Sequence, residues 1–147
     1  MVKFYNINGD IMDTYHIFVI KKEIYNTYKD NPYSLYKSLY NLYNTNKDDL
    51  KLGISIYSQL CNIVNIKKIT EYIKLLPIIR ETNNKYLISK DNKKAIIILK
   101  YSNIIYKYTN INQDILYILN SYSEYLFACN FKKNNYYWIK EKINIEE

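Results

Sequence analysis

The sequence predicts an α+β domain with a mainly antiparallel sheet packed against helices. Residues 95–99 are the most apolar and most β-branched run of the chain, and the pair Asp91 and Asn92 before them marks a tight turn. Predicted strands and helices also come in groups rather than in alternation, which is typical of α+β folds. We therefore expect a single domain over residues 1–147, with the order β-β-α-α-α-β-β-α-β.

The first two strands are expected to form an N-terminal hairpin. Residues 2–8 alternate in side-chain character, and Gly9 between Asn8 and Asp10 supplies a turn. Residues 13–22 follow with apolar side chains on both faces. This pattern predicts an interior strand.

Three helices are predicted next. The first, over residues 31–44, begins at Asn31 and Pro32, because Asn can cap free amides and Pro fits the first turn. The second covers residues 48–64 and the third residues 65–80, where Pro77 ends or kinks it.

The rest of the chain returns to strands. A hairpin is expected from Lys85 to Thr109, and its second strand is expected to run on to Tyr108 with a break at Ser102 and Asn103. The unbroken apolar run at 95–99 predicts a strand covered on both faces. A last helix is expected from Asn112 to near Cys129. Residues 136–140 are expected to form a final edge strand.

The composition is strongly biased toward residues with A/T-rich codons. The chain has 25 Ile, 20 Asn, 20 Lys and 19 Tyr, but one Arg and two Gly. We expect an AT-rich virus or mobile element as the source. The same bias offers a simple explanation for the excess of lysine and tyrosine.

Charge, cysteines and hydropathy limit the function classes. The net charge of +7 permits nucleic acid as a partner, but the basic residues are dispersed and no cluster exceeds two lysines. Cys61 and Cys129 lie in helix-like apolar patterns and are expected to be buried thiols. No signal peptide, apolar membrane span or zinc motif is visible, so we expect a protein of the cytoplasm, or of the host cytoplasm if viral, with no membrane and no metal partner.

No catalytic constellation is recognisable in the sequence. His16 is the one histidine, and it lies in a predicted strand without a neighbouring nucleophile or carboxylate. The paired carboxylates are found at ordinary turn and helix-start positions. Two separated glycines cannot build a phosphate loop. We therefore predict a protein that is not an enzyme and that uses no cofactor.

Two aromatic clusters are the candidate interaction surface. Tyrosine buries a large area at low entropic cost and keeps a polar tip, so it suits interfaces. The alternative is that tyrosine replaces Phe and Leu as core filler in this AT-rich composition. The candidate residues are Tyr33, Tyr36, Lys37, Tyr40 and Tyr43 in the first helix, and Lys132, Lys133, Tyr136, Tyr137, Trp138 and Lys140 near the C-terminus.

A winged-helix interpretation provides candidate nucleic-acid contacts. Three helices followed by a hairpin would place the third helix in the major groove. Its contacts would be Lys67, Lys68, Lys74 and Arg80. The scarcity of arginine and glutamine in this segment counts against base readout.

The sequence thus favours a non-enzymatic protein-interaction module that binds a host protein or a second copy of itself. A nucleic-acid-binding protein, either winged-helix-like or with a basic and aromatic surface, is the alternative. An apolar aromatic patch in the folded chain would favour a protein partner, whereas one continuous face of lysine and tyrosine would favour nucleic acid.

Overall fold

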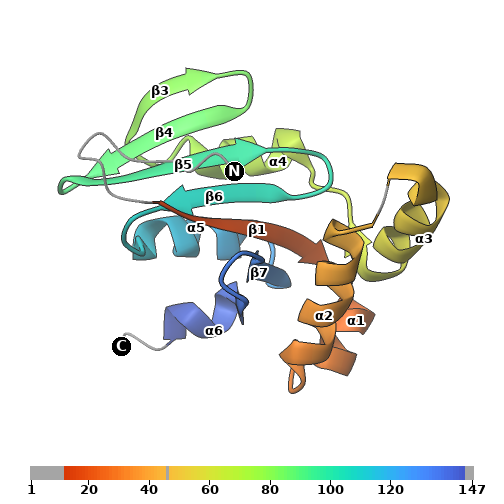
Figure 1. Cartoon of the computed structure of the whole chain (residues 1–147). Coiled ribbons are helices and arrows are strands. Elements are labelled where there is room, and N and C mark those ends of the chain that lie inside the picture. Colours follow the sequence, from red (N-terminus) through yellow and green to blue (C-terminus); the bar gives the residue numbers. More distant parts are fainter. Residues whose placement is uncertain (1–11, 46, 145–147) are drawn as a thin grey trace.

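A single antiparallel sheet organises the chain. The computed structural model describes residues 12–45 and 47–144. Within them, eight strands form one sheet in the order β3-β4-β5-β6-β1-β7-β8, and the short strand β2 pairs with β1 (Figure 1). The predicted α+β class and the antiparallel pairing are confirmed. The strands are β1 (Asp13–Ile20), β2 (Cys61–Asn62), β3 (Ile78–Thr82), β4 (Lys85–Lys90), β5 (Lys93–Leu99), β6 (Ile104–Tyr108), β7 (Leu126–Asn130) and β8 (Asn135–Trp138).

Strand β1 is interior, as its two apolar faces predict. It pairs with β6 on one side and with β7 on the other. The buried residues form two hydrophobic clusters, one on each face of the sheet; Ile17 points into the larger cluster and Phe18 into the smaller one. The strand expected over residues 2–8 and its turn lie outside the described residues.

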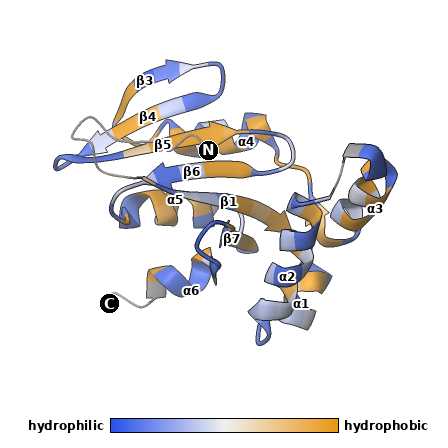
Figure 2. Cartoon of the chain, viewed as in Figure 1, coloured by the Kyte–Doolittle hydropathy of each residue, from blue (hydrophilic) through white to orange (hydrophobic). Residues whose placement is uncertain are grey.

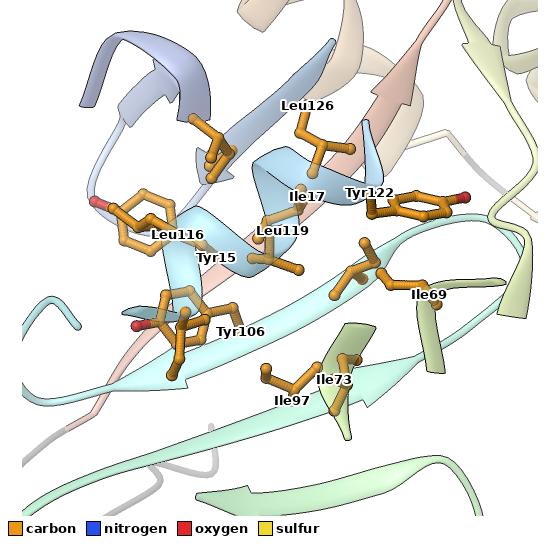
Figure 3. Packing of buried hydrophobic residues seen from close by; sticks show 14 of the residues in the cluster. Tyr15, Ile17, Ile69, Ile73, Ile97, Tyr106, Leu116, Leu119, Tyr122 and Leu126 are labelled. Atoms are coloured by element: carbon orange, nitrogen blue, oxygen red, sulfur yellow. The ribbon is translucent and has the colours of Figure 1, made fainter. Parts of the chain in front are cut away.

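Helices pack on both faces of the sheet. One face is covered by α4 (Ile66–Ile73) and α5 (Gln113–Tyr122), with α6 (Ile139–Asn144) beside α5. Figure 3 shows Ile73 of α4 close to Ile97, and Leu116 of α5 near Tyr15; Ile69, Leu119 and Tyr106 belong to the same cluster. The other face holds a second cluster with α1 (Lys22–Tyr28), α2 (Pro32–Tyr43) and α3 (Leu50–Leu60), the last preceded by the short 3-10 helix η1 (Lys47–Asp49).

Asparagine and aspartate form the turns that glycine would usually form. Asp91 and Asn92 have φ values of 53° and 64° between β4 and β5. Asn83 and Asn84 have φ values of 46° and 63° between β3 and β4. These side chains tolerate the left-handed region, and two such residues in sequence make the tight hairpin turn expected from the pair at 91–92.

Strand β5 is buried mainly on one face. Ala95, Ile97 and Leu99 are buried, whereas Ile96 and Ile98 are half-buried. The prediction of a strand covered on both faces is therefore correct for one face and only partly correct for the other, and the predicted second strand of the hairpin is two strands, β5 and β6. Figure 2 shows many hydrophobic residues in β5, β6, α4 and α5, which contribute to the larger cluster together with residues of β1, β4, β7 and α6.

Several predicted helices are shorter than expected. The third helix ends at Ile73, and Pro77 is followed by strand β3, so Arg80 lies in a strand. The last helix ends at Tyr122, and residues 126–130 form β7. Every residue of β7 is buried, and a short, fully buried run has no periodicity that separates strand from helix.

The two cysteines are buried as predicted, although not in helices. Cys61 lies in β2 and Cys129 in β7. Both thiols belong to the smaller cluster, which also contains Phe18. The apolar neighbours of Cys129 therefore reflect burial in the sheet, whereas Cys61 directly follows helix α3 and is its C-cap residue.

Candidate functional site

A groove lies between helix α2 and the hairpin formed by β7 and β8. Its volume is about 460 Å³. We call it the tyrosine groove, and its walls are Tyr33, Tyr36, Lys37, Tyr40 and Asn41 from α2, and Asn134 and Tyr136 from the hairpin. The structure thus brings residues from the two sequence-predicted aromatic clusters to one place.

The period of α2 places its tyrosines on one flank. Leu35 and Leu39 are buried against the sheet and fix the orientation of the helix. Tyr33 and Tyr40 are seven residues apart, so they lie almost above one another. Their exposed fractions are 56% and 40%, which leaves both rings accessible to a ligand.

Tyr36 forms the floor of the tyrosine groove and joins its two walls. Its ring stacks on Tyr136 with a centroid distance of 4.7 Å and an interplanar angle of 20°. Its hydroxyl donates a hydrogen bond of 2.9 Å to Oδ1 of Asn134. Only 5% of Tyr36 is exposed, and burial raises the pKa of its hydroxyl. Tyr36 therefore holds the groove in shape rather than presenting a free ring.

Aromatic rings continue from the groove toward strand β1. Phe131 stacks on Tyr43 at 4.5 Å between centroids, and the His16 ring lies 5.1 Å from that of Tyr43 and 5.5 Å from that of Phe131. Nδ1 of His16 is 3.2 Å from Oδ1 of Asn103. Burial lowers the pKa of His16, with a smaller opposing effect of Asn103. In the described chain these partners of His16 are an amide and two rings, which supply neither a nucleophile nor a carboxylate.

The second predicted cluster is divided by the sheet. Trp138 is buried beneath Tyr25 and Phe127, and Tyr137 points to the opposite face, where it contacts Tyr15 at 5.3 Å between centroids. Trp138 is a core residue, so the prediction that it belongs to an interaction surface is wrong, and Tyr137 is half-buried against the larger cluster on the face away from the groove. Successive residues of a strand point to opposite faces. Of Tyr136, Tyr137 and Trp138, only Tyr136 lines the groove.

The lysines of that cluster lie around the hairpin. Lys133 forms an ion pair with Asp13, and Nζ of Lys140 lies 4.0 Å from Glu124 and 5.9 Å from the centroid of the Tyr25 ring. Lys132 is exposed in the turn. Among the residues that line the groove, Lys37 is the one charged side chain.

The winged-helix arrangement is not the observed fold. Helix α4, which carries Lys67 and Lys68, buries Ile69 and Ile73 against the sheet. Lys74 is the C-cap residue of that helix, and Nζ of Lys68 lies 5.8 Å from the centroid of the Tyr122 ring. Arg80 lies in β3 and pairs with Leu87 of β4. The residues on either side of Leu87 point into the hydrophobic cluster that contains Ile69 and Ile73 of α4, so Leu87 and Arg80 project from the opposite face of the sheet. The four predicted contacts therefore do not share one surface.

A second hollow lies between α5 and the segment after α4. Its volume is about 600 Å³, and its walls include Leu75, Pro77 and Tyr117. Its two charged residues, Lys90 and Asp114, form an ion pair with each other. This hollow therefore has no uncompensated charge to select a ligand.

The part of the chain that the structure describes contains neither a metal-ligating cluster nor a membrane-spanning helix. No group of three or more His, Cys, Asp or Glu side chains within residues 12–45 and 47–144 could hold a metal ion. None of the helices in these two ranges is long and apolar enough to cross a membrane.

Comparison with known proteins leaves the groove as the basis for functional hypotheses. No protein-family model matches the sequence, and no curated protein is significantly similar to it.

Sequence reasoning identifies most of the groove but misses two of its residues. Five of the seven lining residues are among the predicted aromatic clusters, whereas Asn41 and Asn134 are not. Asn134 has a φ of 56° in the β7–β8 turn. The pair of asparagines at 134 and 135 after two lysines is the signal that marks this turn in the sequence.

Proposed function

We propose that this protein is a non-enzymatic interaction module that binds a segment of a partner protein in the tyrosine groove. The observation that carries this proposal is the packing of Tyr36 against both Tyr136 and Asn134. This packing joins α2 to the hairpin and leaves Tyr33 and Tyr40 exposed on either side of a formed hollow. Tyrosine is among the residues that contribute most to binding at protein interfaces.

Preorganisation supports a binding role. Tyr36 is buried, stacked and hydrogen-bonded, so the floor of the groove loses little further freedom when a ligand binds. Tyr33 and Tyr40 each have two side-chain torsions, which limits the entropy lost when their rings are covered. The groove can therefore contribute binding free energy from a small surface.

The charge around the groove favours a protein over a nucleic acid. A surface that binds a nucleic-acid strand neutralises several phosphates with lysine or arginine. Lys37 is the one cation that lines the groove. Of the other lysines in the predicted clusters, Lys133 and Lys140 face carboxylates of Asp13 and Glu124, and Lys132 is exposed in the turn. Nucleic acid is the second candidate, since exposed tyrosines can also stack on bases.

The source inferred from composition suggests where the partner is found. The excess of residues with A/T-rich codons supports a virus or mobile element as the origin. We therefore propose a host protein of the cytoplasm, or a second copy of this chain, as the partner.

Selection from a library of displayed random peptides tests the proposal while the partner is unidentified. Selected peptides are titrated by calorimetry against the wild type and the double variant Tyr33→Ala with Tyr40→Ala. The matched control is Tyr101→Ala with Tyr117→Ala, because these tyrosines are 71% and 56% exposed and lie outside the groove. The proposal predicts binding weakened at least about tenfold in the first variant and unchanged in the control. Peptides that bind both variants equally well, or no selected peptide at all, would contradict it.

A further inference from the structure

We infer that the segment bound in the tyrosine groove is a proline-rich strand in the polyproline II conformation that carries an acidic residue. This inference rests on the proposed function, because it names the class of segment that the same groove would take. Three features of the groove lead to it: the spacing of its exposed rings, its hydrogen-bonding groups and its single cation.

The spacing of Tyr33 and Tyr40 matches one turn of a polyproline II helix. Seven residues of α-helix advance about 10.5 Å and rotate the side chain by about 20° from its starting direction. A polyproline II helix repeats every three residues, or about 9.3 Å. Prolines three residues apart would therefore meet Tyr33 and Tyr40 on the same side of the ligand. Flat aromatic rings are the usual surface against which such prolines pack.

The polar groups of the groove suit a ligand with unsatisfied carbonyls. A polyproline II strand has no internal hydrogen bonds, so its backbone carbonyls need external donors. Asn41 and the hydroxyls of Tyr33 and Tyr40 belong to the groove and can donate. Oδ1 of Asn134 accepts from Tyr36, which fixes that amide and leaves its NH₂ group as the donor end.

The charge of the groove selects an acidic residue between the two prolines. Lys37 lies between Tyr33 and Tyr40 on the same flank of α2, and no carboxylate lines the groove. A glutamate between the prolines would therefore meet the lysine, whereas a lysine there would be repelled. Association of this pair also depends on salt, because Lys37 is solvent-accessible.

A fluorescein-labelled peptide of repeated Pro-Pro-Glu is the probe that we would use, with fluorescence anisotropy as the readout. A Pro-Pro-Lys repeat keeps the conformation and reverses the charge, and an Ala-Ala-Glu repeat keeps the charge without the prolines. We expect Pro-Pro-Glu to bind the wild type at least about tenfold more tightly than either control peptide. Tyr33→Ala with Tyr40→Ala should weaken this binding by at least a similar factor, and Tyr101→Ala should not change it.

Charge reversal in the protein gives an independent test. Lys37→Glu should lose affinity for Pro-Pro-Glu and gain it for Pro-Pro-Lys, which a general loss of folding cannot produce. Equal binding of the two charge-reversed peptides by the wild type would overturn the role assigned to Lys37. Equal binding of the Ala-Ala-Glu repeat would overturn the polyproline II conformation.

The remaining outcomes separate this inference from the proposed function. Library peptides that need Tyr33 and Tyr40 but contain no proline, together with no binding of Pro-Pro-Glu, would overturn the inference and leave the proposed function standing. Absence of any peptide that needs these tyrosines would overturn both. Binding of labelled oligothymidylate that is tighter than any peptide and needs Tyr33 and Tyr40 would replace both with single-strand nucleic-acid binding.

Discussion

Tyr36 donates a hydrogen bond of 2.9 Å to Asn134, a residue 98 positions further along the chain. This bond links helix α2 to the turn between β7 and β8, and the two elements form the walls of the tyrosine groove. The stacking of Tyr36 on Tyr136 reinforces the same link. The shape of the groove therefore depends on a contact between residues that are remote in sequence.

The energetic coupling of Tyr36 and Asn134 can be measured directly. Tyr36→Phe keeps the ring and removes the hydroxyl, and Asn134→Gly removes the acceptor at a residue whose φ is 56°. We expect each single variant to lose about 1 kcal/mol of unfolding free energy, and the double variant to lose less than the sum. Urea denaturation of the four proteins gives the coupling energy. A coupling of zero would mean that the bond does not hold the walls together.

Ile97 should be essential for folding. It is fully buried in β5, beneath helix α4, and a carboxylate at this position has no partner. We expect Ile97→Asp to give no cooperative unfolding transition in thermal melts followed by circular dichroism. Ile97→Val is the control and should lose only about 1 kcal/mol. A soluble Ile97→Asp protein with a cooperative melt would contradict the position of the core.

The free energy of unfolding should decrease in alkali, and the two buried thiols should contribute to this decrease. Burial raises the pKa of Cys61 from 9.0 to about 12, and burial also raises that of Cys129. Above about pH 9 the unfolded chain loses these protons while the folded chain keeps them, so the free energy of unfolding falls as pH rises. Cys61→Ala should reduce this slope between pH 9 and 10 by up to about 1.4 kcal/mol per pH unit. Urea denaturation at about pH 7, 9 and 10 measures it, and an unchanged slope would contradict the burial of the thiol.

His16 should affect stability in acid but not binding in the groove. Burial lowers its pKa below 6.5, so below that pH the unfolded chain takes up a proton that the folded chain resists. The free energy of unfolding should therefore fall as pH decreases from 6.5, and His16→Gln should flatten this part of the profile. Peptide affinity at neutral pH should be the same for both proteins. Loss of binding in a folded His16→Gln protein would show that the histidine contributes to the site.

Local signals in the sequence predict much of the fold. Pro32 and the leucines at 35 and 39 determine where α2 begins and which side it buries, and Asp91 with Asn92 marks the β4–β5 turn. The prediction of helix at β7 is wrong, because all five of its residues are buried and no alternation remains to indicate a strand. Helix α1 is seven residues long and contains no fully buried side chain, and its half-buried residues Ile24, Tyr25 and Tyr28 form an apolar stripe of a single turn, which is too short to stand out in the sequence.

The groove can be predicted from the sequence only in part, because one of its walls is placed by pairing between distant segments. The tyrosines of α2 follow from helical spacing, which is a local property. Tyr136, in contrast, meets Tyr36 because β7 pairs with β1 and places the hairpin beside α2, and such pairing between distant segments leaves no mark in either segment alone. Alternation along β8 also separates Tyr137 from Tyr136 and Trp138, which share the other face. On that face Trp138 is buried beneath Tyr25, whereas Tyr136 lines the groove.

Mapping of amide chemical shifts by nuclear magnetic resonance would test the proposed binding site most directly. A peptide selected from the display library is added to ¹⁵N-labelled protein, and the shifted amides are assigned. The proposal predicts that shifts concentrate in α2, at Tyr33, Lys37 and Tyr40, and in the turn and strand around Asn134 and Tyr136. Shifts concentrated instead at the second hollow, between α5 and the segment after α4, would contradict the assignment of the tyrosine groove as the binding site.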